Sequence, residues 1–102
     1  MKVAKLIMSD GVRLEIFEMV NPPHEAREPP LEYWKSGTFH FCITALDIDK
    51  TLKRVVELGG NQTSICWQQY PSDPGKRMVY CADPWGTVIA LHSQSFAAMA
   101  GV

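Results

Sequence analysis

Several charged side chains fall where strand alternation would turn them towards the interior of the protein. Arg13 lies in the run VRLEIFEMV and Arg77 opens the run RMVYCAD. Because charged residues rarely face inward without a partner, each arginine needs a negative group nearby. An anionic ligand would serve, and Glu15 would serve equally well. The pattern predicts an interior site in which Arg13, Phe17 and Arg77 contact a bound small molecule.

The stretch CADPWGTVIALH, residues 81–92, adds a second group of candidate residues. It has the pattern of a strand end, a tight Asp-Pro-x-Gly turn and a new strand, on which Ala90 and His92 share one face. His92 has the chemistry of a metal or substrate ligand, and its alternative role is that of a surface histidine at a strand end. Cys42 and Cys81 are predicted on the pocket face. Since neither cysteine has an adjacent base, both are expected to line the pocket rather than act as nucleophiles.

The first part of the chain predicts a β-hairpin followed by a connector. Two β-rich runs, residues 2–8 and 12–20, are joined by SDG, which has the chemistry of a hairpin turn. In the second run, Val12, Leu14 and Ile16 alternate with polar residues and are predicted to face a core. Residues 21–36 hold two Pro-Pro pairs, which argue against a helix or a central strand and predict a surface connector.

The rest of the chain predicts one helix and four strands. The segment 37–47 alternates, with Thr38, His40 and Cys42 on a polar inner face. The helix falls in DIDKTLKRVVELGG, with Asp47 or Asp49 as its N-cap and two glycines as its stop. The order ββ, connector, βαβββ indicates an α+β fold with a mainly antiparallel sheet. Further predicted elements are strands at 63–70, 77–83 and 87–93, a turn at 71–76, and a tail from 95 that is a short helix or frayed.

The composition excludes several classes of protein. The chain has 102 residues, which is enough for one domain with a modest core. Its net charge is -1 and its basic residues are scattered, so nucleic acid is not an expected partner. No apolar run approaches the ~20 residues that span a bilayer, and the first residues lack a signal-peptide core. Three cysteines without CxxC spacing fit a reducing compartment, so a cytoplasmic protein is expected.

Three segments stand in an order that carries a resemblance: the strand GTFHFCITALDID, a helix ending in LGG, and the hairpin DPWGTVIAL. Together they resemble the βαβββ module of the glyoxalase/bleomycin-resistance/extradiol-dioxygenase superfamily, also called vicinal oxygen chelate proteins. VRLEIFE resembles the closing strand of a preceding module. The resemblance implies two modules whose curled sheets form a cup that holds a divalent metal. The implied organisation is a single domain made of a partial first module 1–20, a connector 21–36, a βαβββ module 37–95 and a tail 96–102.

The same resemblance assigns metal ligands to only some of the usual positions. Glu15 would be the carboxylate of the first module's last strand, and His40 the histidine of the second module's first strand. The glutamate of the final strand falls at Ala90, which binds no metal, and another ligand would precede Lys2. A divalent metal such as Zn, Ni, Mn or Fe typically needs ~3 or more protein ligands. His92 or a second copy of the chain could complete the set.

The resemblance implies alternative functions. One is a small-molecule binding protein with a sheet-lined cup and no complete metal site, as in the antibiotic-resistance members. The alternative is a metal-dependent lyase or isomerase of glyoxalase type, with Glu15 as ligand or base and its site completed across a dimer. A third alternative is a relic that folds through dimerisation and has no selected chemistry left. Strand edges left open by the incomplete first module predict a homodimer. Trp85, at a usually polar turn position, is expected at the pocket mouth or against a partner chain.

Overall fold

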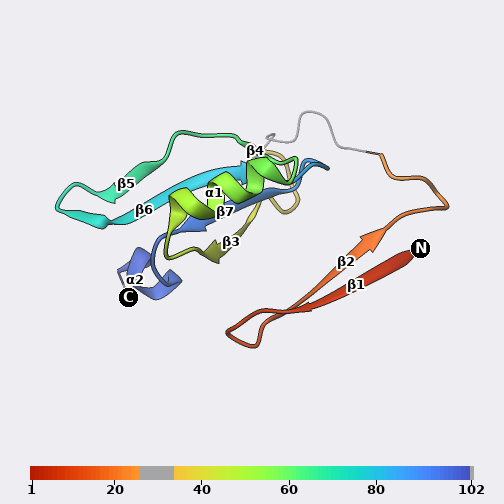
Figure 1. Ribbon diagram of the computed structural model, residues 1–102, viewed down its shortest axis with the longest axis horizontal. Helices are drawn as coiled ribbons and strands as arrows, with labels where there is room; N and C mark the ends of the chain where they lie inside the picture. Colours follow the sequence, from red (N-terminus) through yellow and green to blue (C-terminus); the bar gives the residue numbers. More distant parts are fainter. Residues whose placement is uncertain (26–33, 102) are drawn as a thin grey trace.

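The computed structural model describes residues 1–25 and 34–101 and contains two separate sheets (Figure 1). One sheet has two strands and the other has five, and helix α1 (Ile48–Glu57) lies over the larger one. All strand pairs except one are antiparallel, which confirms the predicted α+β fold with one main helix. Residues 26–33 of the predicted connector, and residue 102, lie outside the described residues.

The predicted N-terminal hairpin is present as β1 (Lys2–Ile7) and β2 (Arg13–Glu18), which pair antiparallel. The turn between them is closed by the Asp10 carboxylate, which accepts a hydrogen bond from the Val12 N–H at 3.0 Å. Gly11 occupies the turn with φ of 88°, a left-handed conformation that only glycine adopts without steric cost. The SDG sequence therefore forms the tight connection that its turn chemistry predicts.

The apolar face of this hairpin is exposed, which corrects one expectation from the sequence. Val12 is 60% exposed and Ile16 is 49% exposed, although alternation predicts both as core residues. The physical reason is that no second layer packs on the two-stranded sheet among the described residues, so alternation creates an apolar face without burying it.

The five-stranded sheet is built from the second half of the chain. Its order is β3 (Phe41–Thr44), β7 (Val88–His92), β6 (Asp73–Ala82) and β4 (Asn61–Gln62), with β5 (Trp67–Tyr70) also paired to β6. β3 and β7 are parallel neighbours, because α1 carries the chain across between β3 and the later strands. This crossover places the first and last strands of the predicted βαβββ segment side by side.

Helix α1 begins and ends where its caps predict. Asp47, the N-cap, accepts a hydrogen bond from the Lys50 N–H at 3.1 Å, which decides between the two predicted cap residues. Gly59, with φ of 97°, follows the last turn, and the Gly60 N–H donates to the Val55 carbonyl at 2.9 Å. The two glycines therefore end the helix as predicted.

The core lies between α1 and the face of the larger sheet that it covers. Ile48 from the helix packs against Val79 and Cys81 of β6 and Leu91 of β7, and all four are nearly or fully buried. Half-buried apolar residues surround this group. The core therefore joins one helix to the centre of one sheet, and the hairpin contributes nothing to it.

The C-terminal tail forms the short helix α2 (Phe96–Ala100), capped by the Ser95 hydroxyl. This decides between the two alternatives that the sequence leaves open for the tail. The predicted turn at 71–76 is shorter than expected, because β6 already begins at Asp73. Neither helix among the described residues has the length and apolar character needed to cross a membrane.

Candidate functional site

The face of the larger sheet turned away from α1 collects several of the predicted site residues. Ala90 of β7 pairs with Cys42 of β3 on one side and with Tyr80 of β6 on the other. His92, two residues further, shares this face by alternation. Ala90 is fully buried and His92 is 8% exposed. We call this surface the cup face, and its central residues are Cys42, Thr44, Met78, Tyr80, Ala90 and His92.

Aromatic rings cluster along the cup face beside Ala90. The His40 ring lies edge-on to the rings of Phe39 and Tyr80, with centroid distances of 4.5 Å and 5.0 Å. Trp67 of β5 extends the cluster, since its ring centroid is 5.5 Å from that of Tyr80. Edge-to-face contacts at these distances are favourable and fix ring orientation. The cluster therefore gives this side of the sheet a rigid, flat-walled apolar surface.

The two histidines of the cup face are both candidates for contact with a ligand. His40 Nδ1 is buried without a hydrogen-bond partner among the described residues. Burial lowers the pKa of His92, and the charge that His40 would carry lowers it further. Both effects favour a neutral His92 imidazole, which can accept a hydrogen bond or bind a metal. The unused nitrogen of His40 is the clearest unsatisfied group on this face.

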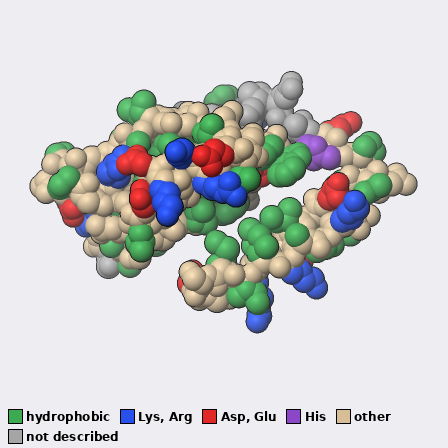
Figure 2. All heavy atoms as spheres, viewed as in Figure 1, with side chains coloured by type: hydrophobic (Ala, Val, Ile, Leu, Met, Phe, Trp, Pro, Cys, Tyr) green, Lys and Arg blue, Asp and Glu red, His purple; other side chains and the backbone are tan. Residues whose placement is uncertain are grey.

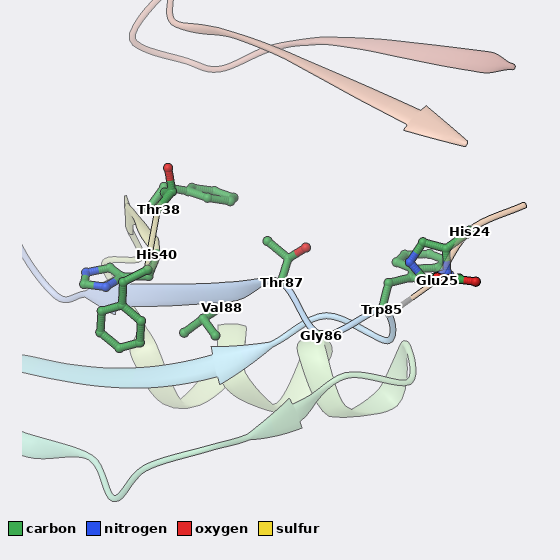
Figure 3. A pocket seen from close by; sticks show the side chains of 10 residues that line it. His24, Glu25, Thr38, His40, Trp85, Gly86, Thr87 and Val88 are labelled. Carbon is green, nitrogen blue, oxygen red and sulfur yellow. The ribbon is translucent and has the colours of Figure 1, made fainter. Parts of the chain in front are cut away.

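A pocket of about 290 Å³ opens at the end of the cup face where β7 begins (Figure 3). Thr38 and His40 lie at one end of it, and His24, Glu25 and Trp85 lie at the other. Its volume lies just below the range of small-molecule sites, which begins at about 300 Å³. The lining residues are His24, Glu25, Thr38, Phe39, His40, Phe41, Trp85, Gly86, Thr87 and Val88.

The Asp-Pro-x-Gly turn holds one side of this pocket in place. The Asp83 carboxylate accepts hydrogen bonds from the N–H groups of Trp85 at 2.9 Å and Thr87 at 2.8 Å. Gly86 has φ of 90°, which lets the chain reverse and leaves the Trp85 ring 64% exposed at the pocket edge. Trp85 was expected either at the pocket mouth or against a partner chain. Within a single chain it lies at the pocket mouth.

Cys81 and Arg77 lie on the opposite side of the sheet, so their predicted position on the cup face is wrong. Cys81 is fully buried in the core beneath α1. The Arg77 guanidinium donates to both carboxylate oxygens of Asp49 on α1, at 3.2 Å each, and to Cys66 Sγ at 3.2 Å. Alternation predicts that odd and even residues of β6 face opposite ways, but it does not say which set faces the helix.

The thiol of Cys42, by contrast, does lie on the cup face, as predicted. Burial raises the pKa of both the Cys42 and the Cys81 thiols, and the Asp83 carboxylate adds to the effect at Cys81. A raised pKa keeps a thiol protonated at neutral pH and therefore a weak nucleophile.

Arg13, Glu15 and Phe17 share one face of β2, as alternation predicts, but on the separate two-stranded sheet. Glu15 lies across from Lys5 of β1. The structure therefore does not place these three residues on the sheet that carries His40 and His92. In residues 1–25 and 34–101, no group of three or more His, Cys, Asp or Glu side chains could hold a metal ion.

The pocket also contains residues that the sequence did not single out as site residues. His24 belongs to the predicted surface connector, and it is exposed but lines the pocket beside Glu25. Thr38 and Thr87 come from segments far apart in the chain that the β3–β7 pairing brings together. One feature of the sequence points to these pocket residues, and it is the turn that contains Trp85. A tryptophan exposed in a tight turn is unusual among surface residues.

Comparison with known proteins adds to this geometry. The family model of the Glyoxalase/Bleomycin resistance protein/Dioxygenase superfamily matches residues 2–91. The chain belongs to this superfamily. A solved glyoxalase family protein from Bacillus cereus has a similar fold, with a TM-score of 0.70 and 24% identity over 88% of this chain. The match covers 59% of that protein, so this chain spans less than two thirds of its length. The comparison with curated proteins finds no match.

Superfamily membership implies a divalent metal, and the donor set of this chain does not fit one. Ala90, which the resemblance aligns with the usual glutamate, cannot bind a metal, and Glu15 belongs to the separate hairpin. On the cup face only His40 and His92 offer imidazole nitrogens, whereas a metal site with open positions uses about three protein ligands. Within residues 1–25 and 34–101, one chain therefore offers too few ligands for a catalytic metal.

Proposed function

We propose that this protein binds a small, flat aromatic molecule in the pocket beside the cup face, without a complete metal site. The observation that carries the proposal is the junction of the pocket with the aromatic cluster at His40. One side of the His40 ring contacts Phe39 and Tyr80, and His40 also lines the pocket. A ligand there would meet the edge of this aromatic cluster.

The charges of the pocket indicate which ligand it prefers. Among the described residues, its lining includes one carboxylate, that of Glu25, and no lysine or arginine. The arginine predicted on the cup face from β6 instead pairs with Asp49 on the helix side. An anionic ligand would therefore lack a charged partner among the lining residues. A neutral or cationic aromatic compound, stacked on Trp85 with its charge near Glu25, suits the pocket better.

Titration with two probes of similar shape and opposite charge tests this proposal. We expect the 1-methylquinolinium cation to bind more tightly than 2-naphthoate, as measured by shifts of the backbone amide NMR signals of Thr87 and Val88. Trp85→Ala should weaken binding of the cation by about fivefold, because it removes the stacking surface. Glu25→Gln should weaken the cation more than the anion.

Phe96→Ala serves as the matched control, since Phe96 is an aromatic side chain, 69% exposed, on α2 outside the pocket lining. This variant should bind both probes as the unmodified protein does. Tighter binding of 2-naphthoate, or equal losses in the Trp85 and Phe96 variants, would overturn the proposal.

A metal-dependent lyase or isomerase of glyoxalase type is a second candidate, favoured by the unpaired nitrogen of His40. It requires ligands from a second copy of the chain, because one copy has too few. Titration of the unmodified protein and of the His40→Ala variant with Ni²⁺ or Zn²⁺ distinguishes the enzyme from the binding protein. Stoichiometric metal that His40→Ala abolishes would favour the enzyme, whereas aromatic binding by metal-free protein would favour the binding function. A cytoplasmic location remains a prediction from the sequence.

A further inference from the structure

The pocket beside the cup face has two unlike ends (Figure 3). Thr38 and His40 lie at one end, and His24, Glu25 and Trp85 lie at the other. A ligand whose ring and charge form a single group can use the chemistry of one end only. The residues at each end, and the wall between them, therefore indicate which class of ligand uses the whole pocket.

The His40 end offers aromatic rings and no carboxylate among the described lining residues. Phe39 and His40 both line the pocket, and their ring centroids are 4.5 Å apart at an angle of 89°. The Tyr80 ring supports this pair, with centroid distances of 5.5 Å to Phe39 and 5.0 Å to His40. Rings that already hold each other lose little freedom when a ligand packs against them. This end therefore suits an uncharged aromatic ring.

The opposite end combines negative charge with an exposed ring. Glu25 lines it, and the Asp83 carboxylate lies in the adjoining turn, where it accepts hydrogen bonds from the N–H groups of Trp85 and Thr87. The Trp85 side chain is 64% exposed, so most of it is open to contact. The space-filling view shows a histidine at the surface between the hairpin and the larger sheet, with acidic and apolar side chains around it (Figure 2). A protonated amine here would gain from both the carboxylates and the tryptophan ring.

The wall between the two ends is neutral. It is formed by Gly86, Thr87 and Val88, and none of these residues has a ring or a charge. A saturated chain needs neither kind of partner, so it fits this part of the pocket. At ~30 Å³ for one water in the liquid, the pocket volume of about 290 Å³ corresponds to roughly ten waters. The ligand therefore has about ten non-hydrogen atoms.

We propose that the ligand of this pocket is an arylalkylammonium ion. Its ring packs at the His40 end, its short saturated chain passes Thr87, and its protonated amine lies between Glu25 and Trp85. This inference rests on the proposed function, because it assigns the ligand class of the same pocket. A fused cation such as 1-methylquinolinium would occupy the Glu25 end alone. The reverse orientation is unfavourable, because an amine at the His40 end finds no carboxylate among the described lining residues.

A series of amines of identical charge tests the ring and the chain separately. Binding is followed by the backbone amide NMR signal of Thr38 at one end and by the indole N–H signal of Trp85 at the other. 3-Phenylpropylammonium should shift both signals. It should bind about tenfold more tightly than n-propylammonium, which lacks the ring and shifts only the Trp85 signal. Benzylammonium is too short to reach both ends and should bind about threefold more weakly than 3-phenylpropylammonium.

Variants at the two ends separate the two contacts. Glu25→Gln should weaken binding of 3-phenylpropylammonium about fivefold, because it removes the negative charge beside the amine. The same variant should leave binding of the uncharged 3-phenylpropan-1-ol unchanged. Phe39→Leu should weaken binding of 3-phenylpropylammonium about threefold, because it removes an aromatic edge. It should leave binding of n-propylammonium unchanged.

Asp73→Asn and Phe96→Leu are the matched controls, since each makes the same kind of change outside the pocket lining. Asp73 is the first residue of β6, at the opposite end of that strand from the pocket turn, and Phe96 is an exposed residue of α2. Both variants should bind every probe as the unmodified protein does. The amide signals of Val79 and Leu91, which are fully buried, report whether each variant is folded.

The outcomes distinguish this inference from the proposed function on which it rests. Equal affinities for 3-phenylpropylammonium and n-propylammonium, with the Thr38 signal unmoved, would overturn the ligand class. Binding of 1-methylquinolinium in that case would leave the proposed function standing. If neither 1-methylquinolinium nor 3-phenylpropylammonium shifts a pocket signal, the proposed function fails as well. A loss in either control variant as large as that in its pocket counterpart would also overturn the assignment.

Discussion

Arg77 of β6 donates two hydrogen bonds of 3.2 Å each to the carboxylate of Asp49 on α1. This paired contact joins the helix to β6, a central strand of the sheet that it covers. It also holds the Arg77 side chain away from the cup face, so the pocket keeps no basic residue from this strand. One ion pair thus contributes to both the packing of α1 and the charge of the candidate site.

The first prediction concerns this ion pair. The hydrogen bonds and charge of Arg77 lower the pKa of Asp49. A carboxyl with a lowered pKa stabilises the fold above its unfolded pKa of about 3.9, and that contribution is lost as the pH falls through the folded value. A double-mutant cycle of Asp49→Asn and Arg77→Met in urea should show a small coupling at neutral pH, because Asp49 is exposed. Coupling of equal size well below about pH 4 would contradict it.

The second prediction concerns His92. Its pKa is lowered by burial and then by His40, so the folded protein resists protonation of this ring. The stability contribution is complete above the unfolded pKa of about 6.5 and is lost as the pH falls from there towards the folded pKa. Thermal unfolding should show this loss of stability as the pH falls. In the His92→Gln variant the loss of stability should be smaller. His24→Gln, a variant of an exposed histidine, should keep the loss, and an identical pH profile in both variants would count against the prediction.

The third prediction restores the superfamily's usual carboxylate. Ala90 is fully buried between Cys42 and Tyr80, so Ala90→Glu places a carboxyl group at a position that is closed to water. We expect the free energy of unfolding to fall by about 3 kcal/mol in urea. Thr44→Glu, on the exposed part of the same face, should change it by only about 0.5 kcal/mol. Equal small effects would mean that this face is open to water at Ala90.

The fourth prediction concerns the glycine that joins α1 to β4. A Cβ at Gly60 would lie 2.5 Å from the Ala82 carbonyl oxygen and 2.7 Å from Val55 Cγ1. Gly60→Ala should therefore lower the free energy of unfolding by about 1–3 kcal/mol. Gly75→Ala is the control, since its Cβ would approach the flexible end of Gln94 at 3.1 Å. A smaller loss for Gly60→Ala than for Gly75→Ala would contradict this account.

Local chemistry in the sequence was sufficient to predict most elements of the fold. The SDG turn forms the hairpin, Asp47 caps α1, and the two glycines after Leu58 end it. These signals act between residues a few positions apart, so the sequence states them directly. Strand alternation likewise grouped Ala90 with His92 and Arg13 with Glu15 correctly, because that grouping depends only on the period of a strand.

The candidate site depended on information that local patterns do not contain. Alternation divided the residues of β6 into two sets, but only the packing of α1 decided that Arg77 and Cys81 face the helix. The separation of Glu15 from His40 follows from the division of the strands into two sheets. The sequence by itself determined most of the elements and the superfamily resemblance, and that resemblance predicts that the usual carboxylate is replaced by Ala90. Tertiary packing alone decided which faces became core and which residues met at the pocket, because those contacts join segments far apart in the chain.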